Sequence, residues 1–407
     1  MRILMLSQFY PPVIGGEERH VRSLGAALAA RGHNVAVATQ WYPGQLETED
    51  DLGVAVHRIR GTMQRSARLF TDASRRHAPP FPDPEFTLGL SRILREFRPD
   101  VVHAHNWIVH SFAPLKHRAG APVVLTLHDY GMVCAKKNLM RGEEVCSGPG
   151  LVKCLDCARG HYGALKGGVT TLSNWMMNGF SPVDKVLTVS SAVAEGNGLA
   201  ARGIPFEVVP NFIPDDAGLA DGAVDPLLEQ LPEQLFLLFV GDLRRQKGIH
   251  VVLDAYARLP DRPPLVLIGR PCPDTPAELP DGARILTNWP HASVMRAWHR
   301  AAVALAPSIW PEPCATVVLE AMACGKPVIA SRMGGMPDMV LDGETGWLVK
   351  PNDPADLARA LSRLLQNPDE ARRMGEAGRR HVAAFEARTV VPRIENVYLS
   401  LLQRRAA

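Results

Sequence analysis

The sequence predicts an α/β protein in which parallel β-sheets are covered by helices on both faces. Short runs rich in β-branched residues alternate with helical stretches, which is typical of parallel sheets because each crossover needs a helix. The alternation runs through the first half of the chain and begins again near residue 236. A Pro-Asn-Phe-Ile-Pro stretch at residues 210–214 separates the halves, so we expect two doubly wound domains joined there.

The first half opens with an expected strand at residues 3–6 and a helix at about residues 17–31. Val21, Leu24 and Leu28 form an apolar stripe along this helix, and Gly32 ends it. Further strands of this half are expected at residues 35–38, 54–59, 101–103, 123–127, 186–189 and 207–209. In the second half, strands are expected at residues 236–240, 265–268, 284–286, 303–306 and 327–331, and helices from residue 248, near 294–301 and at 389–405.

The composition limits the classes of function. The 407 residues are enough for two or three domains, and 46% hydrophobic with 21% charged residues is typical of a soluble globular protein. A net charge of +3 is too nearly balanced to indicate nucleic acid as a partner. No apolar run is long enough to span a membrane, and the apolar N-terminus is too short for a signal peptide, so we expect a cytoplasmic protein. Its seven cysteines are then expected as thiols or metal ligands.

Two glutamates, Glu312 and Glu320, stand eight positions apart in the most informative segment of the chain. A strand-like run precedes Glu312, a helical run carries Glu320, and a Gly-x-Pro turn, another strand and a Gly-Gly pair follow. Carboxylates that face one cleft can hold two sets of vicinal hydroxyl groups. Cys314, Ala315 and Thr316 stand between them, where the free N–H groups of a helix start can bind a diphosphate.

A molecule with hydroxyl groups at both ends and a diphosphate between them is a nucleotide sugar. A solvated loop glutamate beside an ordinary helix-surface glutamate is the alternative, but the surrounding strands and glycines favour the functional interpretation. The pattern resembles the E-x7-E signature of retaining glycosyltransferases of family 4, which have the GT-B fold with two Rossmann-like domains facing a cleft. The resemblance covers essentially the whole chain. It implies that Glu320 binds ribose hydroxyls and that Glu312 binds hydroxyls of the transferred sugar.

The resemblance also implies the domain organisation and the partners. Residues 1–212 would form the acceptor domain and residues 213–388 the domain that binds the nucleotide sugar, while a helix at residues 389–407 crosses back onto the first domain. The partners implied are a nucleotide-sugar donor and a hydroxyl acceptor, such as a glycan, a lipid-linked saccharide or a small-molecule glycoside. The Arg-rich residues 58–84 are expected to form a solvated loop near the acceptor, with peripheral contact at the inner face of the membrane as the alternative.

Two segments of the first half carry further candidate residues. Gly15 and Gly16 let the backbone approach a ligand closely, and they resemble the family's P-x-x-G-G-x-E-R-H-V opening, which implies a place beside the donor diphosphate. His128 follows a buried strand, so we expect it where ligands bind in doubly wound sheets. It matches the family's T-x-H-D motif, which implies contact with the donor sugar near its reacting carbon; a packed structural histidine is the alternative. His103 and His105 share one face of a strand and look like a metal pair, but the family has a similar segment without metal, so we expect His105 on the acceptor side.

A basic loop follows the first strand of the second half. The leaving nucleoside diphosphate gains negative charge, and preorganised cations beside it stabilise the transition state. Lys247 matches the lysine of the family pattern G-R-L-x-x-x-K-G, which implies contact with the diphosphate. Asp242 stands where that pattern has arginine, so we expect Arg244 or Arg245 to reach the diphosphate instead.

The resemblance implies transfer with retention and without a catalytic metal ion or other cofactor, the departing phosphate taking the acceptor proton on the front face. We expect His128, Glu312 and Lys247 to take part in catalysis. A sugar-nucleotide epimerase or a phosphorylase on the same scaffold is one alternative, although no motif for pyridoxal phosphate or free phosphate is present. A non-catalytic protein that binds a nucleotide sugar is the other, because Asp242 and Ala315 depart from the family pattern.

Four of the seven cysteines fall within 24 residues. Cys134, Cys146, Cys154 and Cys157 form the pattern C-x11-C-x7-C-x2-C, with glycines and a proline supplying turns. Four cysteine sulfurs would complete a closed tetrahedral zinc site. Two disulfides or four free thiols are the alternatives, so a structural zinc ion is an expectation here and no part of the catalytic chemistry.

Overall fold

The computed structural model describes residues 1–13, 15–62, 65, 76–177, 183–220, 222 and 224–406. The chain divides into two compact units, one formed by Met1–Arg141, Val145–Pro210 and Val390–Ala407, the other by Gly142–Glu144 and Asn211–Thr389. Part of the Arg-rich segment expected as a loop, residues 63–64 and 66–75, lies outside the described residues.

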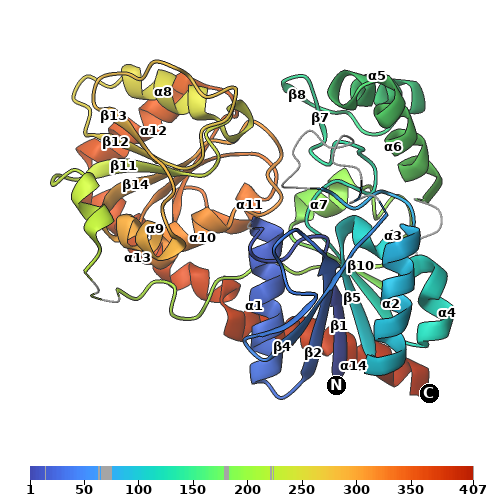
Figure 1. Ribbon diagram of the computed structural model, residues 1–407. Helices are drawn as coiled ribbons and strands as arrows, with labels where there is room; N and C mark the ends of the chain where they lie inside the picture. The colour runs from blue at the N-terminus through green and yellow to red at the C-terminus, as the bar shows by residue number, and fades with distance from the viewer. Residues whose placement is uncertain are drawn as a thin grey trace. The chain divides into compact units, whose positions relative to one another are not determined.

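The first unit is built on an eight-stranded sheet in the order β10-β9-β6-β5-β1-β2-β4-β3, and helices cover both of its faces (Figure 1). Every pair of neighbours is parallel except the edge pair of β3 and β4. The strands are β1 Arg2–Leu6, β2 Asn34–Gln40, β3 Thr48–Asp51, β4 Val54–Ile59, β5 Val101–His105, β6 Val123–Leu127, β9 Lys185–Thr188 and β10 Phe206–Val208. A two-stranded hairpin, β7 Met140–Arg141 and β8 Glu144–Val145, stands apart from this sheet.

Helix α1, Gly16–Ala30, confirms the first helix predicted from the sequence. Its Val21, Leu24 and Leu28 are fully buried, and Gly32 follows with a φ of 86°, a conformation that favours glycine. The other helices of this unit are α2 Pro84–Phe97, α3 Val109–Phe112, α4 Lys116–Ala119, α5 Leu151–Tyr162, α6 Ala164–Met177 and α7 Ser191–Gly196. Two short 3₁₀ turns, η3 Asn106–Ile108 and η4 Ala113–Leu115, directly precede α3 and α4.

The last helix, α14 Ala387–Ala406, is tied to the first unit by polar contacts. Its Glu395 accepts hydrogen bonds from Arg31 at 2.5 Å and bonds with His33 at 2.7 Å. Tyr398 is fully buried, and its hydroxyl oxygen lies 2.6 Å from Nδ1 of His103 on β5. These contacts join the end of the chain to the sheet formed by its beginning.

The second unit is built on a six-stranded parallel sheet in the order β13-β12-β11-β14-β15-β16. Its strands are β11 Phe236–Val240, β12 Leu265–Ile268, β13 Ala283–Leu286, β14 Ala301–Ala306, β15 Val328–Ser331 and β16 Gly346–Val349. Its helices are α8 Ile249–Ala257, α9 His291–Arg300, α10 Thr316–Ala323, α11 Met336–Met339, α12 Pro354–Gln366 and α13 Pro368–His381, with the 3₁₀ turns η5 Pro226–Gln230, η6 Arg245–Lys247 and η7 Val382–Phe385.

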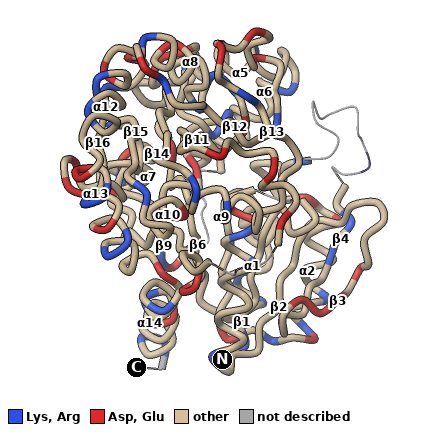
Figure 2. The backbone as a smooth tube through the Cα atoms, turned by 90° about the vertical axis from the view of Figure 1, so that its left-hand side faces the viewer, with Lys and Arg blue, Asp and Glu red and all other residues tan. Residues whose placement is uncertain are grey.

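Both faces of this second sheet are buried, which explains why its strands read as continuous apolar runs. Along β11, Phe236 and Leu238 belong to one hydrophobic cluster, while Leu237 and Phe239 belong to another. The first cluster includes Trp298 of α9 and residues of α10, and the second includes residues of α8 and α12. Charged residues accordingly lie mainly in helices and loops, and the inner strands of both sheets carry few of them (Figure 2).

Each sheet reverses its strand order at one point, as a doubly wound sheet does, which confirms the predicted fold class. In the first unit the reversal lies between β1 and β5, and in the second unit between β11 and β14. Ligands of open parallel sheets bind beyond the carboxyl ends of the strands at such points. The loops after these four strands are therefore the expected positions of functional residues.

The buried histidines of the first unit predict a loss of stability in acid. Burial lowers the pKa of His103 from 6.5 to about 3, so the folded protein keeps this ring neutral while the unfolded chain binds a proton below 6.5. The stabilisation is complete above pH 6.5 and is lost as the pH falls, by about 2 kcal/mol between about pH 7 and about pH 5. When the pH is lowered from the higher to the lower of these values, we expect the unfolding temperature of His103→Gln to fall less than that of the wild type.

The exposed His117 provides the matched control, and His117→Gln should leave the pH dependence of the unfolding temperature unchanged. Differential scanning fluorimetry at both pH values measures the effect. If the unfolding temperature of His103→Gln fell in acid by as much as that of the wild type, His103 would not be a source of the acid instability.

Candidate active site

Glu312 sits in the loop between β14 and α10, where its carboxylate is held by several donors. Lys247 Nζ lies 2.7 Å from Oε1 and 2.6 Å from Oε2, so the ammonium group spans both oxygens. Ser308 Oγ and Trp310 Nε1 donate to Oε2 at 3.2 Å and 2.9 Å. The carboxylate is buried, with 9% of the Glu312 side chain exposed against 30% for Lys247. The sequence predicted both Glu312 and Lys247, but it did not identify Ser308 or Trp310.

The glycine pair that follows β15 forms the support behind Glu312. A Cβ atom on Gly334 would lie 2.4 Å from the carbonyl oxygen of Glu312, and the φ of Gly334 is 59°. The N–H of Gly335 donates to that same carbonyl at 2.7 Å. Only glycine allows this close approach, so the Gly-Gly pair fixes the position of the backbone that carries the carboxylate.

Gly248 has a similar role behind Lys247. Its φ is 81°, and a Cβ atom there would lie 1.9 Å from the carbonyl oxygen of Pro307, the residue that follows β14. The loops after β11 and β14 can therefore pack backbone against backbone. This contact brings Lys247 and Glu312 together, although they are 65 positions apart in the sequence.

Glu320, the fifth residue of α10, forms a second carboxylate pair. It is 4% exposed, and its Oε1 lies 2.9 Å from Nε2 of His291, the first residue of α9. The His291 side chain is 42% exposed. Both predicted glutamates are thus inside the unit, each covered by a more exposed basic residue, and His291 was missed because nothing in its local sequence distinguishes it from a surface histidine.

Asp242, the departure from the family pattern, is placed between two arginines. Arg270 Nη2 lies 3.1 Å from Asp242 Oδ2, and Arg244 Nη2 lies 3.3 Å from the same oxygen. Arg270 follows β12. The loop after β12 pairs with the loop after β11 through the β-bridge between Pro271 and Leu243. Two guanidinium groups around one carboxylate leave a net positive charge, so Asp242 organises cations at this end of the sheet.

Arg245 and the start of α10 complete the residues predicted in this unit. The backbone N–H of Arg245 donates to Asp274 at 2.6 Å, and its side chain is 45% exposed. Ala315 is the N-cap of α10 and makes no side-chain cap bond, so the N–H groups that begin with Thr316 have no side-chain partner from the cap. Burial raises the pKa of the neighbouring Cys314 thiol to about 12, which keeps it neutral.

In the first unit, the glycine pair opens α1. Gly15 is the N-cap of the helix, and a Cβ atom on Gly16 would meet nothing within 4 Å, so there is open space beside the helix start. The side chain of Glu17 accepts a hydrogen bond of 2.8 Å from Asn106 Nδ2. Burial, reinforced by the neighbouring Glu18, raises the pKa of Glu17 to about 8, which favours the protonated acid at neutral pH.

Asn106 joins three segments of this unit. It follows β5 with a φ of 56°, a conformation that asparagine adopts more readily than most residues. Its Nδ2 donates to Glu17, and its Oδ1 accepts from the backbone N–H of His128 at 3.0 Å. An asparagine directly after a central strand was the available signal for this residue, and the sequence analysis did not use it.

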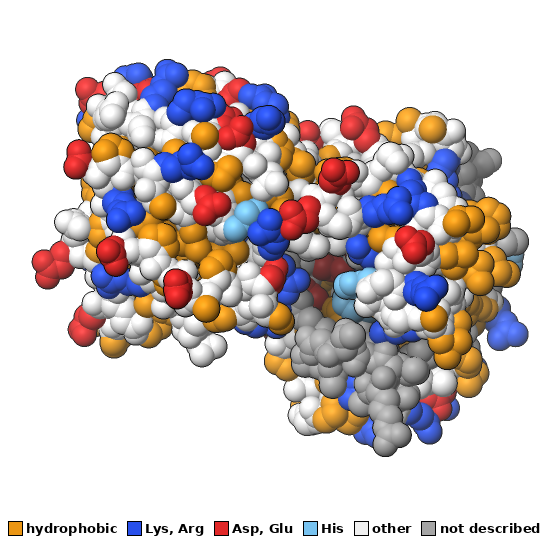
Figure 3. Space-filling view, turned by 90° about the horizontal axis from the view of Figure 1, so that it is seen from above, with side chains coloured by type: hydrophobic (Ala, Val, Ile, Leu, Met, Phe, Trp, Pro, Cys, Tyr) orange, Lys and Arg blue, Asp and Glu red, His pale blue; other side chains and the backbone are white. Residues whose placement is uncertain are grey.

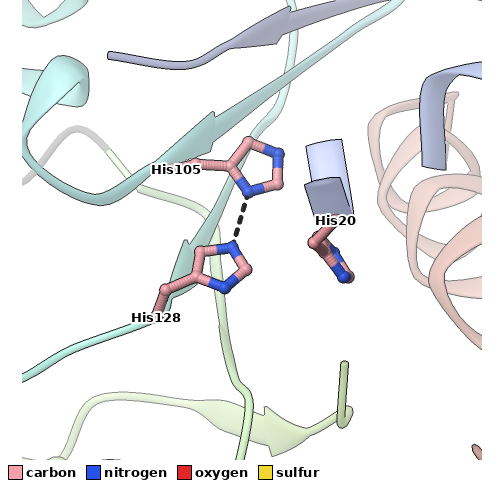
Figure 4. A group of neighbouring side chains, drawn as sticks. All are labelled: His20, His105 and His128. Carbon is pink, nitrogen blue, oxygen red and sulfur yellow. Dashed lines mark hydrogen bonds between the residues drawn. The ribbon is translucent and has the colours of Figure 1, made fainter. Parts of the chain in front are cut away.

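His128 lies at the end of β6, as predicted, beside His105 and His20 (Figure 4). Nε2 of His128 is 2.9 Å from Nδ1 of His105, and the two rings are stacked. His105 has no exposed surface, so it lies behind His128 instead of on a surface that an acceptor could touch. Burial lowers the pKa of His20 to about 4 and the pKa of His105 well below 6.5, so both rings are neutral at physiological pH.

The ligand atoms of His20, His105 and His128 all lie within 4.8 Å of one another. In the part of the chain that the structure describes, no other group of three or more His, Cys, Asp or Glu residues meets this distance. The His103 ring, considered above with His105 as a metal pair, has hydrogen-bond partners at both of its nitrogens. His103 bonds to Tyr398 and to Thr126, at 2.6 Å and 2.7 Å.

The four cysteines of the insert after β6 do not meet as a closed ligand set. All four are free thiols, and no three of their sulfurs lie within 4.8 Å of one another. Cys154 and Cys157 lie on helix α5, where a turn-rich loop was expected. The expected tetrahedral geometry is therefore not preformed, because each sulfur makes its own local contacts within the insert.

The surface agrees with the balanced net charge. On the face that Figure 3 shows, acidic and basic side chains are interspersed. None of the helices in the described residues combines the length and the apolarity needed to cross a bilayer.

Comparison with known proteins identifies two family models on this chain. The model "Glycosyltransferase Family 4" matches residues 14–217, and the model "Glycosyl transferases group 1" matches residues 228–381. A glycogen synthase from Mycobacterium tuberculosis is 30% identical, covering 98% of this chain and 95% of its own. A D-inositol 3-phosphate glycosyltransferase from Streptomyces coelicolor is 29% identical over 78% of this chain and 73% of its own.

Solved structures of GT-B glycosyltransferases share the fold. The sucrose-phosphate synthase from Thermosynechococcus elongatus superimposes with a TM-score of 0.76 at 23% identity, covering 99% of both chains. The catalytic domain of starch synthase IV from Arabidopsis thaliana, bound to ADP and acarbose, gives a TM-score of 0.70 at 19% identity and also covers 99% of both chains. From the two family matches, the full-length relative and the common fold, this chain belongs to glycosyltransferase family 4 and is a glycosyltransferase with the GT-B fold.

Proposed function

We propose that this enzyme transfers a sugar from a nucleoside-diphosphate sugar to a hydroxyl group of its acceptor, with retention of anomeric configuration. The observation that carries the proposal is the pair of buried carboxylates, Glu312 and Glu320, each covered by a more exposed basic residue on either side of a helix start. This arrangement suits a ligand with hydroxyl groups at two places and a diphosphate between them. Solved relatives with bound UDP or ADP support a nucleoside-diphosphate donor.

In this proposal Glu320 holds the ribose. His291 occupies one carboxylate oxygen, Oε1, so Oε2 can accept a hydrogen bond from a ribose hydroxyl. His291 keeps the carboxylate in a fixed orientation, and a charge-assisted hydrogen bond from the ribose is then made without reorganising the protein.

Lys247 and Glu312 act together on the other end of the donor. Lys247 is more exposed than Glu312, so an arriving diphosphate meets the ammonium group first. Its shift toward the phosphate frees carboxylate oxygens of Glu312 for the sugar hydroxyls, while Ser308 and Trp310 hold the carboxylate in place. The arginines around Asp242 and the start of α10 add positive potential for the leaving group, where each preorganised donor contributes about 10²–10³ in rate.

The sugar is transferred in one front-face step. The acceptor oxygen forms a bond to the anomeric carbon as the bond from that carbon to the phosphate oxygen breaks, and the departing phosphate takes the acceptor proton. A double displacement would need a carboxylate at the anomeric carbon, whereas Glu312 and Glu320 are both assigned to hydroxyl groups.

In the first unit, we assign His128 to the donor sugar near its reacting carbon and Gly15 and Gly16 to the diphosphate. His105 is a positioning residue, because it bonds to His128 and has no exposed surface. A neutral imidazole can donate to a hydroxyl without adding a competing charge. The acceptor is a glycan, a lipid-linked saccharide or a small-molecule glycoside, and the enzyme acts in the cytoplasm or at the inner face of the membrane.

A thermal-shift screen against common nucleotide sugars, UDP and ADP tests the proposal. A donor at 100 times its dissociation constant adds about 2.7 kcal/mol to the free energy of unfolding, so the correct donor should raise the unfolding temperature clearly. Product formation is then followed with that donor and candidate acceptors. Epimerisation of the donor without acceptor would instead identify an epimerase.

Glu320→Gln should weaken binding of the nucleoside diphosphate itself. The lost hydrogen bond to ribose involves a charged group, so we expect about a 10-fold to 100-fold rise in dissociation constant. Isothermal titration calorimetry with the nucleoside diphosphate found in the screen measures it. The exposed Glu376 of α13 is the control, and Glu376→Gln should bind like the wild type. Unchanged affinity in Glu320→Gln would contradict the ribose assignment.

Glu312→Gln should reduce turnover far more than nucleotide affinity. Because Glu312 is assigned to the transferred sugar, we expect kcat to fall by about 10²–10³ while the dissociation constant of the nucleoside diphosphate changes by less than about threefold. Steady-state kinetics and calorimetry on the same preparation separate the two effects. A variant with wild-type kcat would remove Glu312 from the catalytic residues.

Brief treatment with a chelator should leave sugar transfer intact. The positive groups assigned to the diphosphate are Lys247, the arginines around Asp242 and the N–H groups of a helix start. EDTA removes none of these. Initial rates measured within minutes of adding EDTA should match those of untreated enzyme. Immediate loss of activity that magnesium or manganese alone restores would contradict a metal-independent mechanism and would direct attention to His20, His105 and His128 as ligands.

A further inference from the structure

The insert between β6 and α5 gathers four cysteines around one cavity. Cys134 lies in the turn after β6, Cys146 follows β8, and Cys154 and Cys157 lie one turn apart on the same side of α5. All four are free thiols, and all four line a single small cavity of about 20 Å³. Four residues within a span of 24 are thus brought around a space of the size of a single ion.

Backbone N–H groups surround the sulfur of Cys134 in the turn after β6. Burial raises the pKa of this thiol, while the backbone N–H groups of residues 136–139 hydrogen bond to the sulfur and lower it. A turn that directs several consecutive N–H groups at one sulfur stabilises negative charge on it.

Two of the other sulfurs also receive hydrogen bonds. The backbone N–H of Gly150 donates to Cys154 Sγ at 3.4 Å, and Lys136 Nζ lies 3.5 Å from Cys157 Sγ. Lys136 and Lys153 both line the cavity, so positive charge stands beside the four sulfurs. Four thiolates around one divalent cation carry net negative charge, which these lysines offset.

We propose that Cys134, Cys146, Cys154 and Cys157 bind one Zn²⁺ ion in a structural site. Zinc takes four thiolates in a tetrahedron with bonds of about 2.3 Å, and a closed set of this kind leaves no position for substrate. Because no three sulfurs lie within 4.8 Å of one another, binding draws the side chains inward into the cavity they already line. The protons of the four thiols leave to solvent as the zinc–sulfur bonds form.

The zinc site would hold the insert in place relative to the end of β6. The N–H of Cys134 donates to the carbonyl of Tyr130 at 2.9 Å, and the N–H of Tyr130 donates to the carbonyl of Lys137 at 3.1 Å. Tyr130 stands two residues after His128 and is fully buried. A metal ion that joins Cys134 to α5 therefore connects that helix to the loop that begins at the candidate catalytic histidine.

Metal analysis of the full chain tests the proposal. The protein is produced without a histidine tag in zinc-supplemented medium, and its zinc and iron contents are measured by mass spectrometry. We expect about one zinc ion per chain, and release of that ion when a thiol-blocking reagent is added. Replacement by Co²⁺ should give the sulfur-to-cobalt charge-transfer absorption of thiolate ligands.

The double variant Cys154→Ser with Cys157→Ser should lose the zinc, and Cys272→Ser, in the other unit, should retain it. Zinc at background level in the wild type, iron in place of zinc, or disulfides in the protein isolated without reductant would each overturn the proposal. These measurements on the wild type decide the matter even if the double variant does not fold. Zinc that persists in a folded double variant would also overturn it, because His20, His105 and His128 would then be the ligands.

Discussion

The structure depends on the burial of both faces of its parallel sheets. Alternate residues of β11 enter two different hydrophobic clusters, so the inner strands have no face on which a polar group can meet water. Polar chemistry is therefore confined to the loops at the strand ends, and the reversal of strand order brings two of these loops together in each unit. Lys247 and Glu312 follow β11 and β14 for this reason, and Asn106 follows β5 beside the glycines that follow β1.

The buried charges of the second unit are each matched by a partner. Glu312 is bound by an ammonium group and by two neutral donors, and Glu320 by an imidazole. These hydrogen bonds hold both carboxylates in a fixed orientation. Asp242 follows the same rule at the surface, where it holds two arginines in the loops after β11 and β12. Asp242, which stands where the family pattern has arginine, thus lies beside Arg270, a residue outside that pattern.

Three histidines of the first unit are neutral instead. Burial lowers the pKa of the rings of His103, His105 and His20. Glu17 is driven in the opposite direction, toward its protonated form, by the same burial.

The sequence by itself determined the alternation of strands and helices, because the burial of both sheet faces imposes continuous apolar runs that can be read directly. Strands β4, β6, β11 and β12 have the predicted bounds, and α1 was placed within one residue at each end. The sequence also identified Glu312, Glu320, Lys247 and His128, since a local motif surrounds each of them. Only the tertiary structure brought in His291, Arg270, Asn106 and Trp310 and moved His105 behind His128. These residues are defined by contacts between loops that are distant in the sequence, and such contacts leave no periodic signal in the chain.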